Sequence, residues 1–135
     1  MGIVNTLAKC LDSPYLFADA EAKNRIGGLL AMAGDRLEAA SNLQSTGQGD
    51  PADVTFLCYE AMFSCIRALV YAKGYREAGL RCLLLACETI YVRPGLLDVE
   101  FLHAFERIQG LKASPEDSLA SASALIKRTL QLLAQ

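Results

Sequence analysis

Apolar side chains recur at steps of three and four residues along most of the chain, and short polar segments separate the runs. The first run is short, carries Ile3, Leu7 and Leu11, and ends at Ser13-Pro14. Such steps place apolar residues on one face of an α-helix, and no run of alternating apolar and polar residues indicates a strand. The pattern therefore predicts an all-α protein.

The first long helix is expected over residues 19–44, and a polar loop over residues 45–49 follows it. The residues of its apolar face are Ile26, Leu29, Leu30, Ala33 and Leu37. Glycines at positions 27, 28 and 34 weaken this helix by up to about 1 kcal/mol each relative to Ala. They also allow a neighbouring helix to approach closely.

A second helix begins at Asp50-Pro51, where an N-cap acceptor precedes a proline at the first helical position. It continues to about residue 71–73 and ends at Gly74. Apolar residues surround it almost completely, which is typical of a helix in the middle of a bundle. Those on its main face are Phe56, Tyr59, Phe63, Ile66 and Val70.

Three further helices are expected, over about residues 76–91, 97–112 and 115–133. Pro94-Gly95 ends the first of them, and the segment from Ser114 to Asp117 has the order of a capping box before the last. We therefore predict a single domain over residues 1–135, an all-α up-and-down bundle of four main helices plus one or two short ones. The predicted core includes Phe56, Phe63, Ile66, Leu83, Leu84, Ile90, Phe105, Ile108, Ile126 and Leu130.

The composition and net charge of the chain exclude some classes of protein. Of the 135 residues, 53% are apolar and 21% are charged, which excludes a disordered chain. The net charge of −2 also argues against tight, non-specific binding of nucleic acid, which needs a basic protein. One chain of this size is not expected to bury so much apolar surface, so we predict a homodimer.

The chain has five cysteines without a CxxC pair and one histidine, His103. A zinc site would lack ligands, so we predict no metal and no cofactor. The cysteines are expected to be reduced thiols that pack as small apolar side chains, as in a cytoplasmic protein. No apolar run reaches the twenty residues of a membrane span, and the N-terminus lacks the pattern of a signal peptide. We therefore expect a cytoplasmic protein with no membrane contact.

Two charged features are candidates for binding. Glu60, Ser64 and Arg67 form a stripe on the second helix, which is either its solvated edge or a polar seam against a partner or in a cleft. Residues 67–93 carry five basic residues against two acidic ones. This span is either a phosphate-facing surface or a set of cations that suit the helix dipole.

His103 is the only histidine that could act as a catalytic base, and no nucleophile lies one helical turn from it. It shares a helix face with Arg107, four residues later, so the two side chains can act on one anion. If the protein binds a phosphate-bearing ligand, we expect five residues to contact it, although each alone is also explained as an ordinary surface cation. They are Arg67, Arg76, Arg81, His103 and Arg107.

The stretch from Tyr59 to Val70, reading YEAMFSCIRALV, continues with KGYR at residues 73–76 and RCLL at 81–84. With Phe105-Glu106-Arg107 before Ser-Pro-Glu-Asp, it resembles the HEPN family over about residues 50–133. The resemblance implies a small helical bundle linked to nucleotide or RNA binding, often encoded beside a minimal nucleotidyltransferase. Ribonucleases of the family have an Arg that is followed, four to six residues on, by a His, whereas His103 and Arg107 stand in the reverse order. Positions 96–98, where that Arg would stand, hold Leu96, Leu97 and Asp98.

The resemblance therefore implies a non-catalytic member of the family. We expect a dimer that binds a nucleotide or nucleic acid, or that is the protein partner of a nucleotidyltransferase. Two alternatives stay open. One is a ribonuclease-like toxin with a rearranged site around His103 and Arg107, and the other is a purely structural interaction module.

Overall fold

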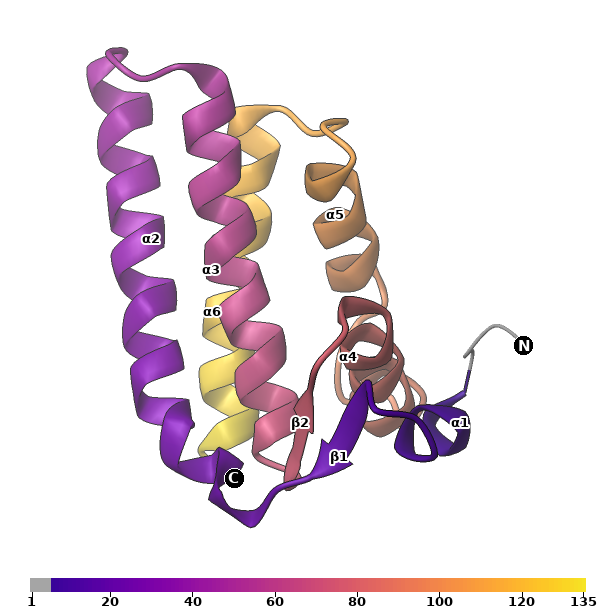
Figure 1. Cartoon of the computed structure of the whole chain (residues 1–135). Helices are drawn as coiled ribbons and strands as arrows, with labels where there is room; N and C mark the ends of the chain where they lie inside the picture. The colour runs from indigo at the N-terminus through magenta and orange to yellow at the C-terminus, as the bar shows by residue number, and fades with distance from the viewer. Residues whose placement is uncertain (1–5) are drawn as a thin grey trace.

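The computed structural model describes residues 6–135, so the predicted position of Ile3 lies outside the described residues. Helices dominate the fold, with two very short strands (Figure 1). The α-helices are α1 (Leu7–Leu11), α2 (Ile26–Thr46), α3 (Pro51–Tyr71), α4 (Leu80–Cys87), α5 (Glu100–Gln109) and α6 (Pro115–Leu133). The other elements are strands β1 (Leu16–Ala18) and β2 (Tyr75–Glu77), the 3-10 helix η1 (Ala20–Arg25) and the π-helix η2 (Glu88–Val92). The predicted all-α class is confirmed.

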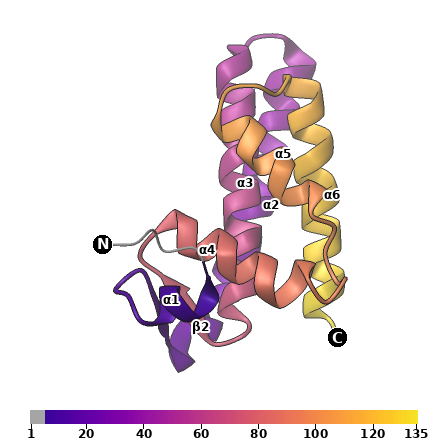
Figure 2. The same ribbon diagram turned by 90° about the vertical axis from the view of Figure 1, so that its right-hand side faces the viewer.

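Helix α3 is the centre of the bundle. It packs along α2 on one side and along α6 on another, while α5 and α4 cover parts of its remaining surface (Figures 1 and 2). Its start follows the sequence prediction, because the Asp50 side chain accepts a hydrogen bond from the Ala52 N–H at 2.9 Å and Pro51 stands at the first helical position. Since α3 is enclosed on several sides, it supplies more buried residues than any other helix described.

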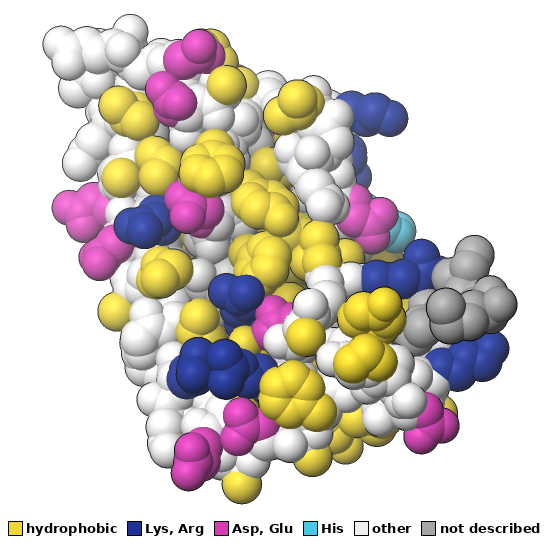
Figure 3. Space-filling model, in the orientation of Figure 1, with side chains coloured by type: hydrophobic (Ala, Val, Ile, Leu, Met, Phe, Trp, Pro, Cys, Tyr) yellow, Lys and Arg dark blue, Asp and Glu magenta, His cyan; other side chains and the backbone are white. Residues whose placement is uncertain are grey.

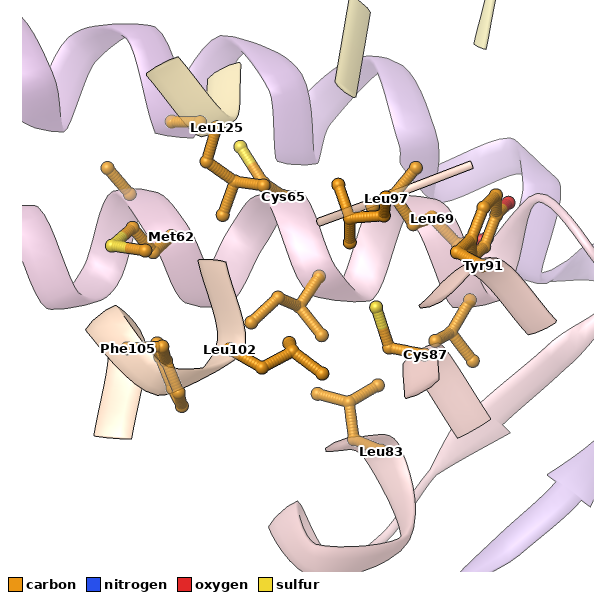
Figure 4. Close-up of a cluster of buried hydrophobic side chains, with 14 of the residues drawn as sticks. Met62, Cys65, Leu69, Leu83, Cys87, Tyr91, Leu97, Leu102, Phe105 and Leu125 are labelled. Carbon is orange, nitrogen blue, oxygen red and sulfur yellow. The ribbon is translucent and has the colours of Figure 1, made fainter. Parts of the chain in front are cut away.

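The core lies where α3 meets α4, α5 and α6. In Figure 4, Leu125 of α6 lies against Cys65 of α3, while Leu69 of α3 lies near Leu97 and Tyr91. Among the predicted core residues, Ile66, Leu83, Phe105 and Ile108 are buried. Phe63, Leu84, Ile90 and Ile126 are partly buried and pack against the core.

Two predicted core residues are exposed, so those predictions were wrong. Phe56 is 58% exposed, because α4 packs only beside the C-terminal half of α3 and a hollow remains between Phe56 and the end of α5 (Figure 1). Leu130 is 49% exposed. The buried face of α6 follows Ala122, Leu125 and Thr129, and Leu130 stands one residue, about 100° of helical rotation, beyond that face.

The prediction that the chain has no strand was also wrong. Strands β1 and β2 pair antiparallel, with Phe17 opposite Arg76. Three residues are too few to show an alternating pattern in the sequence. The strand β2 also delays the helix expected from residue 76, which begins at Leu80 and becomes the π-helix η2 at Glu88. The helix expected from residue 19 likewise starts as η1, which Asp19 caps through the Glu21 N–H at 2.9 Å.

Cysteines divide into two groups. Cys10 and Cys82 form a disulfide that ties α1 to α4, with their Cα atoms 5.6 Å apart, so the prediction of five reduced thiols was wrong for this pair. The sequence spacing of 72 residues gave no sign that the fold would bring them together. Cys58, Cys65 and Cys87 are free and buried, as expected. Burial raises the pKa of these three thiols to about 11, 11 and 12.

Within residues 6–135, one helix is long and apolar enough to cross a membrane. It is α3, whose most apolar window has a mean hydropathy of 1.4. In the fold, 67% of that window is buried by the rest of the chain. A mostly buried core helix can pass the same test without crossing a membrane, so length and hydropathy are weak evidence for a membrane span here.

Candidate functional site

Three aromatic side chains follow one another along the exposed side of α3. Their ring centroids are 6.4 Å apart between Phe56 and Tyr59, and 5.8 Å apart between Tyr59 and Phe63. Phe105 of α5 supports them from below, with its ring centroid 4.9 Å from that of Tyr59. The guanidinium carbon of Arg67 lies 4.3 Å from the centroid of the Phe63 ring and closes the series. We call Phe56, Tyr59 and Phe63 the aromatic row.

The aromatic row belongs to a wider apolar surface. Figure 3 shows hydrophobic side chains gathered over the middle of the face on which α3 and α5 meet, with Lys and Arg side chains below them. A hollow of about 230 Å³ between α3 and α5 is lined by Phe56, Tyr59 and the 84% exposed Leu111. A second hollow of about 590 Å³ lies between α4 and α5, and Gln109 lines both. A partly apolar surface therefore extends across α3, α4 and α5.

A buried carboxylate holds Arg67 in place at the end of the aromatic row. Glu77 of β2 has a side chain that is only 5% exposed, and it accepts a hydrogen bond from Arg67 Nε at 2.8 Å. The Tyr71 hydroxyl donates to the other Glu77 oxygen. Burial, and then the hydrogen bond to Glu77, raise the pKa of Tyr71 to about 12. A buried charge needs such partners, and Glu77 is the polar partner that Arg67 requires within an apolar helix.

The structure brings Arg67 and Arg76 into one neighbourhood. Both positive charges act on the Tyr71 hydroxyl and oppose the rise of its pKa. Arg76 Nη1 also lies 3.9 Å from Asp19 Oδ2, so this guanidinium has an acidic neighbour of its own. The sequence reasoning missed Glu77 and Tyr71. Tyr71 follows Arg67 by four residues, a spacing that places the two on one face of a helix and could have indicated the contact.

The other three predicted site residues lie elsewhere. His103 Nδ1 is 3.6 Å and Arg107 Nη2 is 2.5 Å from the Glu100 carboxylate. His103 and Arg107 share a face of α5, as predicted from their spacing, but both contact Glu100 of the same helix. The hydrogen bond from Arg107 holds the pKa of Glu100 below its usual value. Arg81 lines the hollow between α4 and α5, so the five residues are divided among three places.

No three His, Cys, Asp or Glu side chains of residues 6–135 are grouped so that they could hold a metal ion. The absence of structural zinc remains a prediction, which elemental analysis of protein purified without added metal will test. A full equivalent of zinc that resists chelation would contradict it.

Comparison with known proteins identifies the family. The HEPN domain model matches residues 27–111, from the first turn of α2 to just past the end of α5. A search of curated proteins found no match to the chain, and a search of solved structures found none either. Because the family model covers more than half of the sequence and agrees with the motifs on α3, this chain belongs to the HEPN domain family.

Proposed function

We propose that this HEPN domain is a non-catalytic binding module that works as a homodimer, and that the dimer is the protein partner of a minimal nucleotidyltransferase. The exposed aromatic row carries the proposal. A 58% exposed phenylalanine beside two partly buried aromatic rings is costly to leave in water, and aromatic side chains are enriched at protein interfaces.

The residues of the chain do not favour catalysis. The Arg and His spacing of the family's ribonucleases is absent at positions 96–98. The remaining pair, His103 and Arg107, contacts Glu100 on an exposed helix. The Glu100 carboxylate occupies the positive charge of Arg107, which an RNA phosphate would otherwise contact. This arrangement on an exposed surface does not favour RNA cleavage. RNA cleavage that disappears in a His103→Ala variant would instead support the toxin alternative.

The nucleotidyltransferase partner follows from the family, many of whose members are encoded beside such an enzyme. The hollow between α4 and α5 leaves a second surface for this partner beside the dimer contact. Its apolar floor consists of Leu80, Leu84, Leu85 and Leu102, with Arg81, Glu88 and Glu106 at its rim. A mixed apolar and charged lining suits a protein surface better than it suits a bare phosphate.

Binding of a phosphate-bearing ligand is a second candidate function, and the closeness of Arg67 and Arg76 favours it. Both guanidinium groups lie near the Tyr71 hydroxyl and are partly exposed. Titration with nucleotides and short RNA at low and moderate salt tests it, with Arg76→Ala compared against Arg107→Ala. Weaker binding in the Arg76 variant alone supports this site, and equal binding in both variants contradicts it.

Light scattering on purified protein tests the dimer. Phe56→Ser removes the most exposed ring of the row and should convert the dimer to a monomer without unfolding it. Leu130→Ser is the matched control, because Leu130 is 49% exposed but lies on α6, away from the row. Loss of the dimer in both variants, or in neither, would contradict the assignment of the interface to α3.

A further inference from the structure

A row of charges runs beside the aromatic row on α3. Asp53, Glu60 and Arg67 follow each other at steps of seven residues, which is close to two helical turns, so they lie on one side of the helix. Asp53 is exposed. Glu60 and Arg67 have side chains that are 32% and 40% exposed. The sign of the charge therefore changes from negative to positive along α3.

The middle of this charged row is balanced within one chain. Arg36 of α2 lies with its Nε 3.4 Å from Glu60 Oε1, and its side chain is 38% exposed. The two ends differ in their surroundings. Asp53 stands in the first turn of α3, and Arg67 is held rigidly between Glu77 and the Phe63 ring. The row therefore has an exposed carboxylate at one end and an ion pair at its centre. At the other end stands a guanidinium that pairs with buried Glu77 but keeps 40% of its side chain exposed.

The aromatic row is centred on the same part of α3 as the row of charges. Phe56 and Phe63 are also seven residues apart, and Tyr59 and Glu60 stand midway between them. A twofold axis that passes this midpoint at right angles to α3 would place Phe56 of one copy against Phe63 of the other. The same rotation would place Asp53 against Arg67. Contacts that exchange two residues in this way define an isologous dimer interface.

The charges distinguish the two directions in which two α3 helices can pack. Side by side in parallel, two Asp53 carboxylates face each other and so do two Arg67 guanidinium groups, and like charges across an interface are unfavourable. Antiparallel packing replaces both repulsions with two attractions. The two Arg36–Glu60 pairs then meet at the centre with alternating signs.

We infer that the occupant of this surface is a second copy of the chain, packed with its α3 antiparallel, and that Asp53 of each copy pairs with Arg67 of the other. The inference rests on the proposed homodimer and adds its direction and register. It gives Arg67 two roles. Within its own chain the residue neutralises Glu77, and between chains its exposed edge meets a carboxylate.

The first test reverses one charge. Asp53→Arg should weaken the dimer about tenfold at low salt, because both attractive pairs of the dimer become repulsive, and added salt should restore part of the loss. Glu38→Arg is the matched control. Glu38 is exposed on α2, two residues from Arg36, which places it on the far side of that helix from Glu60. Equal dimer constants for the two variants would overturn the inference.

The second test measures the direction in which the two α3 helices pack, and it leaves the sequence of α3 unchanged. Spin labels are placed on α2 in separate variants, Asp35→Cys and Ser45→Cys, at exposed positions. Because Arg36 contacts Glu60, position 35 lies near the proposed twofold axis and position 45 lies about nine residues of helix from it, at about 1.5 Å per residue. Antiparallel packing predicts a clearly longer label-to-label distance at position 45.

The outcomes separate this inference from the proposed function. Equal distances at the two labelled positions would overturn the antiparallel register while leaving the dimer in place. The absence of any coupling between labels, together with a monomeric mass, would contradict the proposed homodimer itself.

Discussion

Reduction of the Cys10–Cys82 disulfide should weaken the fold substantially. The bond closes a loop of 72 residues, and the chain entropy that such a loop removes from the unfolded state corresponds to about 4 kcal/mol. Few buried side chains anchor residues 6–18, because only Cys10 and Leu16 are buried there, although β1 also pairs with β2. We therefore expect a phosphine reductant to lower the free energy of unfolding of the wild-type chain by up to about 4 kcal/mol.

Equilibrium unfolding in urea, followed by circular dichroism with and without the reductant, measures this loss. A Cys10→Ala/Cys82→Ala variant is the control, since the reductant has no bond to break in it. Thiol counting in urea supplies an independent check and should find three reactive thiols without reduction and five with it. The reasoning would be refuted by five reactive thiols in the unreduced chain or by identical urea midpoints with and without the reductant.

Three further predictions concern the core and the Glu77 cluster. Phe105→Ala should lower the free energy of unfolding by about 3–5 kcal/mol, because Phe105 is fully buried. Leu130→Ala, at a half-exposed position away from the aromatic row, should lower it by about 1 kcal/mol or less. Urea unfolding compares the two variants, and equal losses would contradict the burial. Glu77→Gln should lower the pKa of Tyr71, because the Glu77 carboxylate raises that pKa. Ultraviolet titration of the Tyr71 phenol measures the shift, and an unchanged pKa would contradict the contact. Burial raises the pKa of the Cys87 thiol from 9.0 to about 12, so the thiol loses its proton at a lower pH in the unfolded chain than in the folded one. The free energy of unfolding should therefore fall as the pH rises above 9. A constant urea midpoint from pH 8 to 11 would contradict this prediction.

Helix positions could be predicted from the sequence where caps and periodicity agree. Asp50-Pro51 and Ser114-Pro115 mark helix starts that the structure places at Pro51 and Pro115, because an N-cap side chain and a proline act through local geometry. The strands could not be predicted, since β1 and β2 depend on a pairing between residues about sixty positions apart. The disulfide depends on the same long-range approach.

The candidate site was predictable only in part. The need of Arg67 for a polar partner follows from its place in an apolar helix, but Glu77 reaches it from a strand whose position the sequence pattern does not reveal. Helical periodicity predicts a core position for Phe56, because it gives the direction of a side chain but not what covers it. The exposure of that ring decides whether it is a core residue or part of an interface, and only the packing of α4 and α5 against α3 shows that exposure.

Sedimentation equilibrium of the wild-type chain over a wide range of concentration tests the central claim most directly. A homodimer built on the aromatic row predicts a mass that rises with concentration to twice the chain mass of 14.6 kDa, and a Phe56→Ser variant that stays at the chain mass. A wild-type protein that remains at 14.6 kDa up to hundreds of micromolar would contradict the account.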